Sequence, residues 1–283
     1  MNHAINNAEY EKVIADRQKE VFKANSLIQE AKFSLTALEQ RAILYVITKV
    51  KPTDTSATEY EFDINHFYNI IGWKNESYTE FKKMLKGLAD KSWYASIDDT
   101  GTECLLRWFT DVRLNKKSNK VILRFHDNLM PFITHLAENN VYYTKYQLQY
   151  VLPMGCRYSP RLYELLKSYE FNNWEWFFDI DALKRLLDCE NYKNFSDFKR
   201  FALEPAVAEV NKFSDLRIAY DLERKGRKIT RVIFYFKKKT KERLLETEDT
   251  IRDELDGQLD IFGIEKRVNE SDTVRRRFLR GEE

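Results

Sequence analysis

A sequence pattern that occurs twice constrains the fold of this chain more than any other feature. Glu80-Phe81-Lys82-Lys83 matches Asp197-Phe198-Lys199-Arg200 at an offset of 117 residues. Upstream of each copy, Phe62-Asp63-Ile64 matches Phe178-Asp179-Ile180 at an offset of 116 residues. Matching segments with matching flanks indicate internal duplication. A chain of 283 residues is also long enough for two domains. We therefore expect two similar units in tandem.

The first copy predicts an amphipathic helix near residues 77–93. At about 100° per residue, Phe81 and Leu85 lie on one face of this helix, and Lys82, Lys83 and Lys86 lie on the other. A lysine face of this kind most often covers a core, but its duplication favours a periodic, anionic ligand.

The second copy predicts a helix over residues 194–213 with the same division into two faces. The apolar face holds Phe198, Phe201, Ala202, Pro205 and Ala206, and the outward face holds Ser196, Arg200, Glu204, Val207 and Asn211. Pro205 should bend this helix near Phe201, because proline removes a backbone donor and crowds the preceding turn. Two short helices are the alternative.

The order of the remaining elements predicts a winged helix in each unit. In the first unit, Thr36 and Glu39 form a capping box, a strand at 60–64 and a helix capped by Asn65 follow, and Ser77 caps the lysine helix. Strands at 93–97, 104–114 and 121–125 then form the wing.

The second unit repeats this order. Ser159 caps a helix with Pro160 at its first position, a strand covers 176–180, and Asp181 caps a short helix. After the 194–213 helix, strands at 216–220 and 229–236 enclose a basic turn. The predicted class is α+β: two tandem winged-helix domains related by internal duplication, with a polar C-terminal tail. The expected boundaries are a flexible arm at 1–25, the first domain at 26–140, the second at 141–240, and a charged tail at 241–283.

Several classes of protein are disfavoured by what the sequence lacks. Cys104, Cys156 and Cys189 are too few and too scattered for a disulfide framework or a zinc site. The four histidines form no close pair, and the eight glycines include no phosphate-binding loop. The chain has no window of 18 apolar residues and no export signal, so we expect a cytoplasmic protein without a membrane contact. We expect no catalytic residue, metal or cofactor, although a nicking enzyme with a nucleophilic tyrosine remains the alternative from another class.

Double-stranded DNA is the ligand that this pattern favours. Residues 141–240 hold 19 Lys and Arg against 13 Asp and Glu. Arg200 could bond guanine in the major groove, with Ser196, Glu204 and Asn211 as further groove-facing candidates. The residues expected to contact phosphates are Lys82, Lys83 and Lys86 in the first unit and Lys193, Lys199, Arg224, Lys225, Arg227 and Lys228 in the second. The second unit is therefore expected to specify sequence.

Over residues 21–240 the chain resembles the iteron-binding replication initiators of theta-replicating plasmids. The resembling segments are Asn25-Ser26-Leu27-Ile28 with Leu35-Thr36-Ala37-Leu38-Glu39-Gln40-Arg41, the helix from Ser159 to Leu166, and the run from Phe198 to Lys228. The resemblance implies binding to direct repeats at a plasmid origin, opening of adjacent DNA and recruitment of host replication proteins. It also implies a monomer in equilibrium with a homodimer that represses its own gene, with the first winged helix forming the dimer contact. A transcriptional repressor with the same two domains and no role in initiation is the nearer alternative.

A short motif in the tail suggests one further partner. Gln258-Leu259-Asp260-Ile261-Phe262 looks like the pentapeptide that replication proteins insert into the sliding clamp. The alternative is an apolar patch that packs back on the protein.

Overall fold

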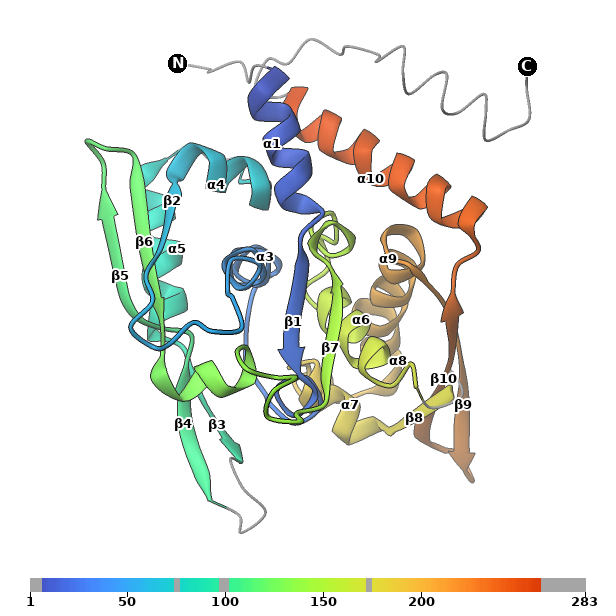
Figure 1. Cartoon of the computed structure of the whole chain (residues 1–283). Helices are drawn as coiled ribbons and strands as arrows, with labels where there is room; N and C mark the ends of the chain where they lie inside the picture. Colours follow the sequence, from blue (N-terminus) through green and yellow to red (C-terminus); the bar gives the residue numbers. More distant parts are fainter. Residues whose placement is uncertain (1–6, 74–76, 97–101, 172–174, 261–283) are drawn as a thin grey trace, which may run out of the picture.

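The computed structural model describes residues 7–73, 77–96, 102–171 and 175–260. Figure 1 shows two units side by side, with strands β1 (Glu20–Ala24) and β7 (Tyr143–Gln147) between them and helix α10 (Lys241–Asp260) across the top. None of the helices in the described residues is long and apolar enough to cross a membrane.

The first unit combines helices with a three-stranded antiparallel sheet. Its elements are α2 (Asn25–Gln29), α3 (Ala37–Ile47), β2 (Tyr60–Asp63), α4 (Ile64–Ile71), α5 (Tyr78–Asp90), β3 (Ser92–Ser96), β4 (Glu103–Arg107), β5 (Phe109–Asn115), β6 (Lys120–Phe125) and the 3-10 helix η1 (Asp127–Phe132). The strand order of the sheet is β2-β6-β5.

The second unit follows the same plan. Its elements are the 3-10 helix η2 (Leu148–Tyr150), α6 (Ser159–Ser168), β8 (Glu175–Asp179), α7 (Ile180–Leu186), α8 (Phe195–Phe198), the π-helical turn η3 (Lys199–Leu203), α9 (Glu204–Phe213), β9 (Leu216–Lys225) and β10 (Lys228–Lys238). Its sheet has the equivalent order β8-β10-β9. The tips of the β5–β6 and β9–β10 hairpins point toward opposite ends of the molecule (Figure 1). The predicted tandem winged-helix class is confirmed.

An additional hairpin distinguishes the first unit. β3 pairs with β4, whereas β5 pairs with β6, so residues 104–114 form two strands and not the single strand that we expected. The division falls at Trp108, whose ring is 1% exposed and lies 4.6 Å from Trp93 and 5.1 Å from Phe33, measured between centroids. Burial of this large ring turns the chain from one sheet into the next.

Helix termini agree with the sequence at some positions and differ at others. Thr36 and Glu39 form the expected capping box, and Ser77 accepts a hydrogen bond from the Glu80 N–H. Three predicted caps are wrong, because each helix begins at or before the predicted residue. The observed N-caps are Asp63 in place of Asn65, Tyr158 in place of Ser159, and Asp179 in place of Asp181.

The N-terminal segment is ordered, which corrects the expectation of a flexible arm over its described part. Residues 7–17 form α1 (Asn7–Arg17), in which Val13, Asp16 and Arg17 are buried. β1 then pairs with β7 along its whole length. Pairing with a strand from later in the chain supplies hydrogen bonds and burial that a polar sequence does not reveal by itself.

The first part of the tail is also packed against the protein. In α10, Ile251, Leu255 and Leu259 recur every four residues and are at most 5% exposed. Asp256 accepts a hydrogen bond of 2.7 Å from the hydroxyl of Tyr10. The apolar stripe of this helix therefore connects the end of the chain to its beginning.

The two units share a core. Buried apolar residues from both units and from α10 belong to one continuous cluster. At the junction, the ammonium of Lys23 lies 2.8 Å from the Glu164 carboxylate, and both side chains are nearly inaccessible. Gln40 donates a hydrogen bond to the Arg157 carbonyl, and Arg41 donates one to the Met154 carbonyl. The two winged helices are consequently fixed relative to each other.

Candidate nucleic-acid interface

The predicted recognition segment is helical from Phe195 to Phe213 but changes its winding in the middle. α8 passes into the π-helical turn η3, and α9 begins at Glu204 with Pro205 in its first turn. Proline has no N–H and its ring crowds the carbonyl four residues earlier, so a wider turn before Pro205 removes the conflict. The segment therefore has a π-helical turn, neither a simple bend nor two separate helices.

The π-helical turn changes which side chains face outward. Phe198, Ala202 and Ala206 are fully buried as expected, but Phe201 is 48% exposed, which corrects its assignment to the apolar face. The Phe201 ring stacks on Tyr192 with an interplanar angle of 20°, and the Arg200 guanidinium lies 5.0 Å from the Phe201 centroid. A regular helical wheel cannot predict this outward aromatic residue, because the π turn adds one residue to the winding.

Arg200 is an outward cation that is accessible to a ligand. Its side chain is exposed, and it forms no ion pair with any described residue. Lys199 by contrast lies 3.4 Å from the carboxylate of Glu204. Ser196 and Lys193 are also exposed at the start of the segment. An exposed guanidinium with free donors suits bidentate recognition of a base edge.

Asn211 has a structural contact that removes it from the groove-facing set. Its amide nitrogen donates to the Ile218 carbonyl at 2.9 Å, and its amide oxygen accepts from the Ile218 N–H at 2.8 Å. These bonds occupy the donor and acceptor pair that adenine recognition would require. Asn211 therefore joins α9 to β9, and its expected role at a base is corrected.

The tip of the second wing presents four cations. Arg224, Lys225, Arg227 and Lys228 are all exposed, and Lys225 and Lys228 face each other across the hairpin. Gly226 between them has φ +63°, the left-handed conformation that a tight turn needs. Cations gathered at a protruding hairpin suit contact with a phosphate backbone.

The lysine helix of the first unit is exposed but partly neutralised. Lys83 lies 2.6 Å from Glu80, and Lys86 lies 2.5 Å from Asp90, while Lys82 is exposed on the same helix. These exposed pairs are weak and separate readily. α5 is therefore a less cationic surface than the second unit.

The clamp-like motif lies where α10 packs on the protein. Leu259 is 1% exposed, and the Gln258 side chain accepts a hydrogen bond of 3.2 Å from Arg17. Asp260 is the last residue of α10, and Ile261 and Phe262 lie outside the described residues. A partner could not take up the first two residues without detaching them, so the alternative of a patch packed on the protein is correct for them.

The described residues offer no feature that activates a tyrosine. Burial raises the pKa of Tyr68 to about 12, and the neighbouring Tyr78 adds to this shift. Deep burial also raises the pKa values of Tyr146 and Tyr163 well above their usual range. No group of three His, Cys, Asp or Glu side chains in the described ranges could hold a metal ion.

Together, the two sheets, the exposed helices and the basic wing define a tandem winged-helix protein. The chain belongs to the initiator replication protein family: its first winged-helix model matches residues 20–167 and its second matches residues 179–236. The first model extends through α6, beyond the expected domain boundary at residue 140.

Known replication proteins are similar to the chain over most of its length. It is 25% identical over 228 residues to a replication initiation protein of Escherichia coli, covering 76% of this chain and 68% of that protein. A crystal structure of Pi initiator protein in complex with iteron DNA matches with a TM-score of 0.61 and 19% identity, covering 79% of this chain and 98% of that one.

Proposed function

We propose that this protein is a DNA-binding plasmid replication initiator that binds direct repeats, or iterons, at an origin. Arg200 supplies the base contact, and the wing cations from Arg224 to Lys228 hold the phosphates. The observation that carries the proposal is an exposed Arg200 without an ion pair among the described residues, in the same unit as a wing tip with four exposed cations.

The similarity to known proteins supports DNA with direct repeats as the ligand. A related crystal structure contains iteron DNA, and the chain belongs to a family of replication initiators. Exposed Phe201 supports Arg200 by stacking beneath its guanidinium. Such stacking limits the rotamers of the arginine and orders its donors before DNA arrives.

Binding to a duplex with one direct repeat tests this assignment. Arg200→Ala should lose about 1–3 kcal/mol of preference for the repeat over random duplex, since a base contact is lost. Arg227→Ala is the matched control, because a phosphate contact should weaken binding to both duplexes equally and reduce the salt dependence. Equal loss on both duplexes for Arg200→Ala would assign it to the backbone instead.

Initiation requires more than binding, and the proposal includes opening of the DNA beside the repeats and recruitment of host replication proteins. The fixed arrangement of two winged helices supports opening, because one rigid body on two grooves can impose curvature on the duplex. Permanganate reactivity of thymines next to the repeats measures opening. A protein that binds the repeats and leaves those thymines unreactive would be a repressor.

A homodimer that represses its own gene completes the proposal. The hairpin β3–β4 of the first unit supports it, because Tyr94 is 64% exposed and Leu105 is 38% exposed on paired strands. Exposed apolar side chains on a protruding hairpin are typical of association surfaces. Sedimentation across a concentration series should give a monomer–dimer equilibrium that Tyr94→Ser shifts toward monomer, and an unchanged equilibrium would exclude this surface.

A further inference from the structure

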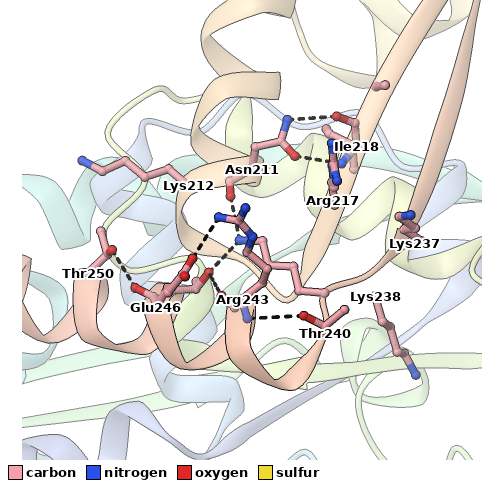
Figure 2. A pocket seen from close by; sticks show the side chains of 13 residues that line it. Asn211, Lys212, Arg217, Ile218, Lys237, Lys238, Thr240, Arg243, Glu246 and Thr250 are labelled. Carbon is pink, nitrogen blue, oxygen red and sulfur yellow. Dashed lines mark hydrogen bonds and ion pairs between the residues drawn. The ribbon is translucent and has the colours of Figure 1, made fainter. Parts of the chain in front are cut away.

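A basic groove lies on the second unit away from the wing tip. It has a volume of about 690 Å³ and forms where the end of α9, the base of the β9–β10 hairpin and the start of α10 meet (Figure 2). Its cations come from all three elements and the adjoining loop: Lys212, Arg217, Lys237, Lys238, Lys239 and Arg243. Glu246 is the acidic residue among the described residues of its lining.

Most of this positive charge is not neutralised by the protein. Arg243 pairs with Glu246 at 3.0 Å, and Lys238 lies 3.8 Å from Glu170. Lys212, Arg217 and Lys237 form no ion pair with any residue that the structure describes. Like charges held together without partners repel each other, and an anion in the groove would relieve that repulsion.

Lys239 shows that the positive charge is held in a defined position. Its ammonium donates to the Asn211 carbonyl at 2.6 Å and to the Thr247 hydroxyl at 2.8 Å, which joins α9 to α10. Burial lowers the pKa of Lys239 to about 8. A partly buried cation that the protein itself disfavours would be stabilised by an incoming anion.

The other lining groups favour phosphate as that anion. The N-terminus of α10 opens beside Thr240, so the positive end of its helix dipole faces the groove, whereas the Thr247 and Thr250 hydroxyls donate to carbonyls of α10 itself. Lysine, arginine, hydroxyl groups and helix N-termini are the usual donors to DNA phosphates. The lining contains no aromatic ring for a base, and Ile218 is only 4% exposed, so it offers little anchor for a peptide.

The position of the groove indicates which molecule carries the phosphates. Glu204, Ala208 and Lys212 form an exposed stripe along α9 that continues from Arg200 to the groove. Twelve residues of helix span about 18 Å, which exceeds the width of about 12 Å of the major groove. A duplex with Arg200 in its major groove therefore has phosphates of its flank in the direction of Lys212.

We propose that the basic groove binds backbone phosphates of the DNA flanking the repeat, on the same molecule that the recognition segment contacts. The inference rests on the proposed function. A flank of the bound duplex is present at high effective concentration, which favours it over a second, separate DNA molecule. By holding the flank against α10, the groove would bend the duplex around the second unit.

The test uses Arg217→Ala combined with Lys237→Ala, two exposed side chains without ion pairs. Binding is measured on a repeat-only duplex and on a duplex extended by about two helical turns, or about 20 base pairs, on each side. The double variant should bind the extended duplex several-fold more weakly and the repeat-only duplex unchanged. The salt dependence on the extended duplex should fall by about 0.9 in logarithmic slope for each lost phosphate contact.

A matched control removes two exposed cations elsewhere, with Lys12→Ala and Lys51→Ala in α1 and the loop after α3. This control should keep wild-type affinity on both duplexes. If the Arg217→Ala, Lys237→Ala variant binds both duplexes equally more weakly, the inference is overturned. No change on either duplex would also overturn it, and would favour an acidic protein segment as the occupant of the groove. The inference would also be overturned if a second, separate duplex raised the affinity of the wild type and the double variant lost only that increase. A wild type with no preference for the repeat would instead contradict the proposed function.

Discussion

At the scale of single residues, Asn211 and Phe201 show how an outward position differs from a binding role. Asn211 lies on the polar face of its helix, yet both ends of its amide bond the backbone of Ile218. Phe201 is apolar, yet it is exposed beside Arg200. The exposure of Arg200 and the wing cations follows from helical periodicity and turn chemistry. The contact of Asn211 depends on a strand, and the exposure of Phe201 depends on a π turn, and helical periodicity predicts neither.

Asn211→Ala should lower the free energy of unfolding by about 1–3 kcal/mol, because it removes two hydrogen bonds and leaves backbone groups of Ile218 without partners. Urea denaturation measures the change. Ser196→Ala, at an exposed position of the same segment, should change stability by no more than about 0.5 kcal/mol. If Asn211→Ala keeps full stability and loses preference for the repeat, Asn211 contacts a base as the sequence predicts.

Glu164 is the second residue with a predicted effect. Lys23 and Glu164 form a buried pair, so Glu164→Ala leaves a buried ammonium without its partner and should cost about 3–5 kcal/mol of stability. Burial lowers the pKa of Lys23 below its usual 10.5. The unfolded chain then binds more protons than the folded one as the pH rises toward 10.5, so stability increases with pH in that range.

Without Glu164 the Lys23 pKa falls further, and the deficit of the variant should shrink between pH 7 and pH values near 10. Denaturation of both proteins across this range measures the deficit. Glu61→Ala is the control, since its pair with Lys120 is exposed. If the stability difference between Glu164→Ala and the wild type stays constant with pH, the unpaired Lys23 ammonium is not its cause.

At the scale of elements, the sequence predicts those whose stability is local and misassigns those that depend on distant partners. Neighbouring residues encode the capping box at Thr36, the equivalent strands β2 and β8, and the wing turn at Gly226. β1 has no such local signal, because its partner β7 lies more than 100 residues away. α10 is similar: its apolar stripe is present in the sequence, but the surface that it covers is not.

Leu259→Ala tests the packing of α10. Leu259 is buried against the shared core, so its truncation should cost about 2–5 kcal/mol of stability. Asp253→Ala, at an exposed position of the same helix, is the control and should have little effect. Unchanged stability of Leu259→Ala, together with lost binding to a sliding clamp, would return the motif to its original interpretation.

At the scale of the whole molecule, the duplicated units form one body. Their shared core, the buried Lys23–Glu164 pair and α10 fix the relative positions of α5 and the segment from Phe195 to Phe213. The two wings point in opposite directions in Figure 1. Duplication in the sequence predicts two winged helices but not this rigid junction, because the groups that form it lie outside the repeated pattern.

A hydroxyl-radical footprint of the protein on a single direct repeat tests the central claim most directly. If both units contact one duplex through successive major grooves, protection should appear in two tracts about 10 base pairs apart on one face of the DNA. Arg200→Ala should weaken the tract assigned to the second unit first. A single protected tract, or tracts on opposite faces of the duplex, would contradict the account.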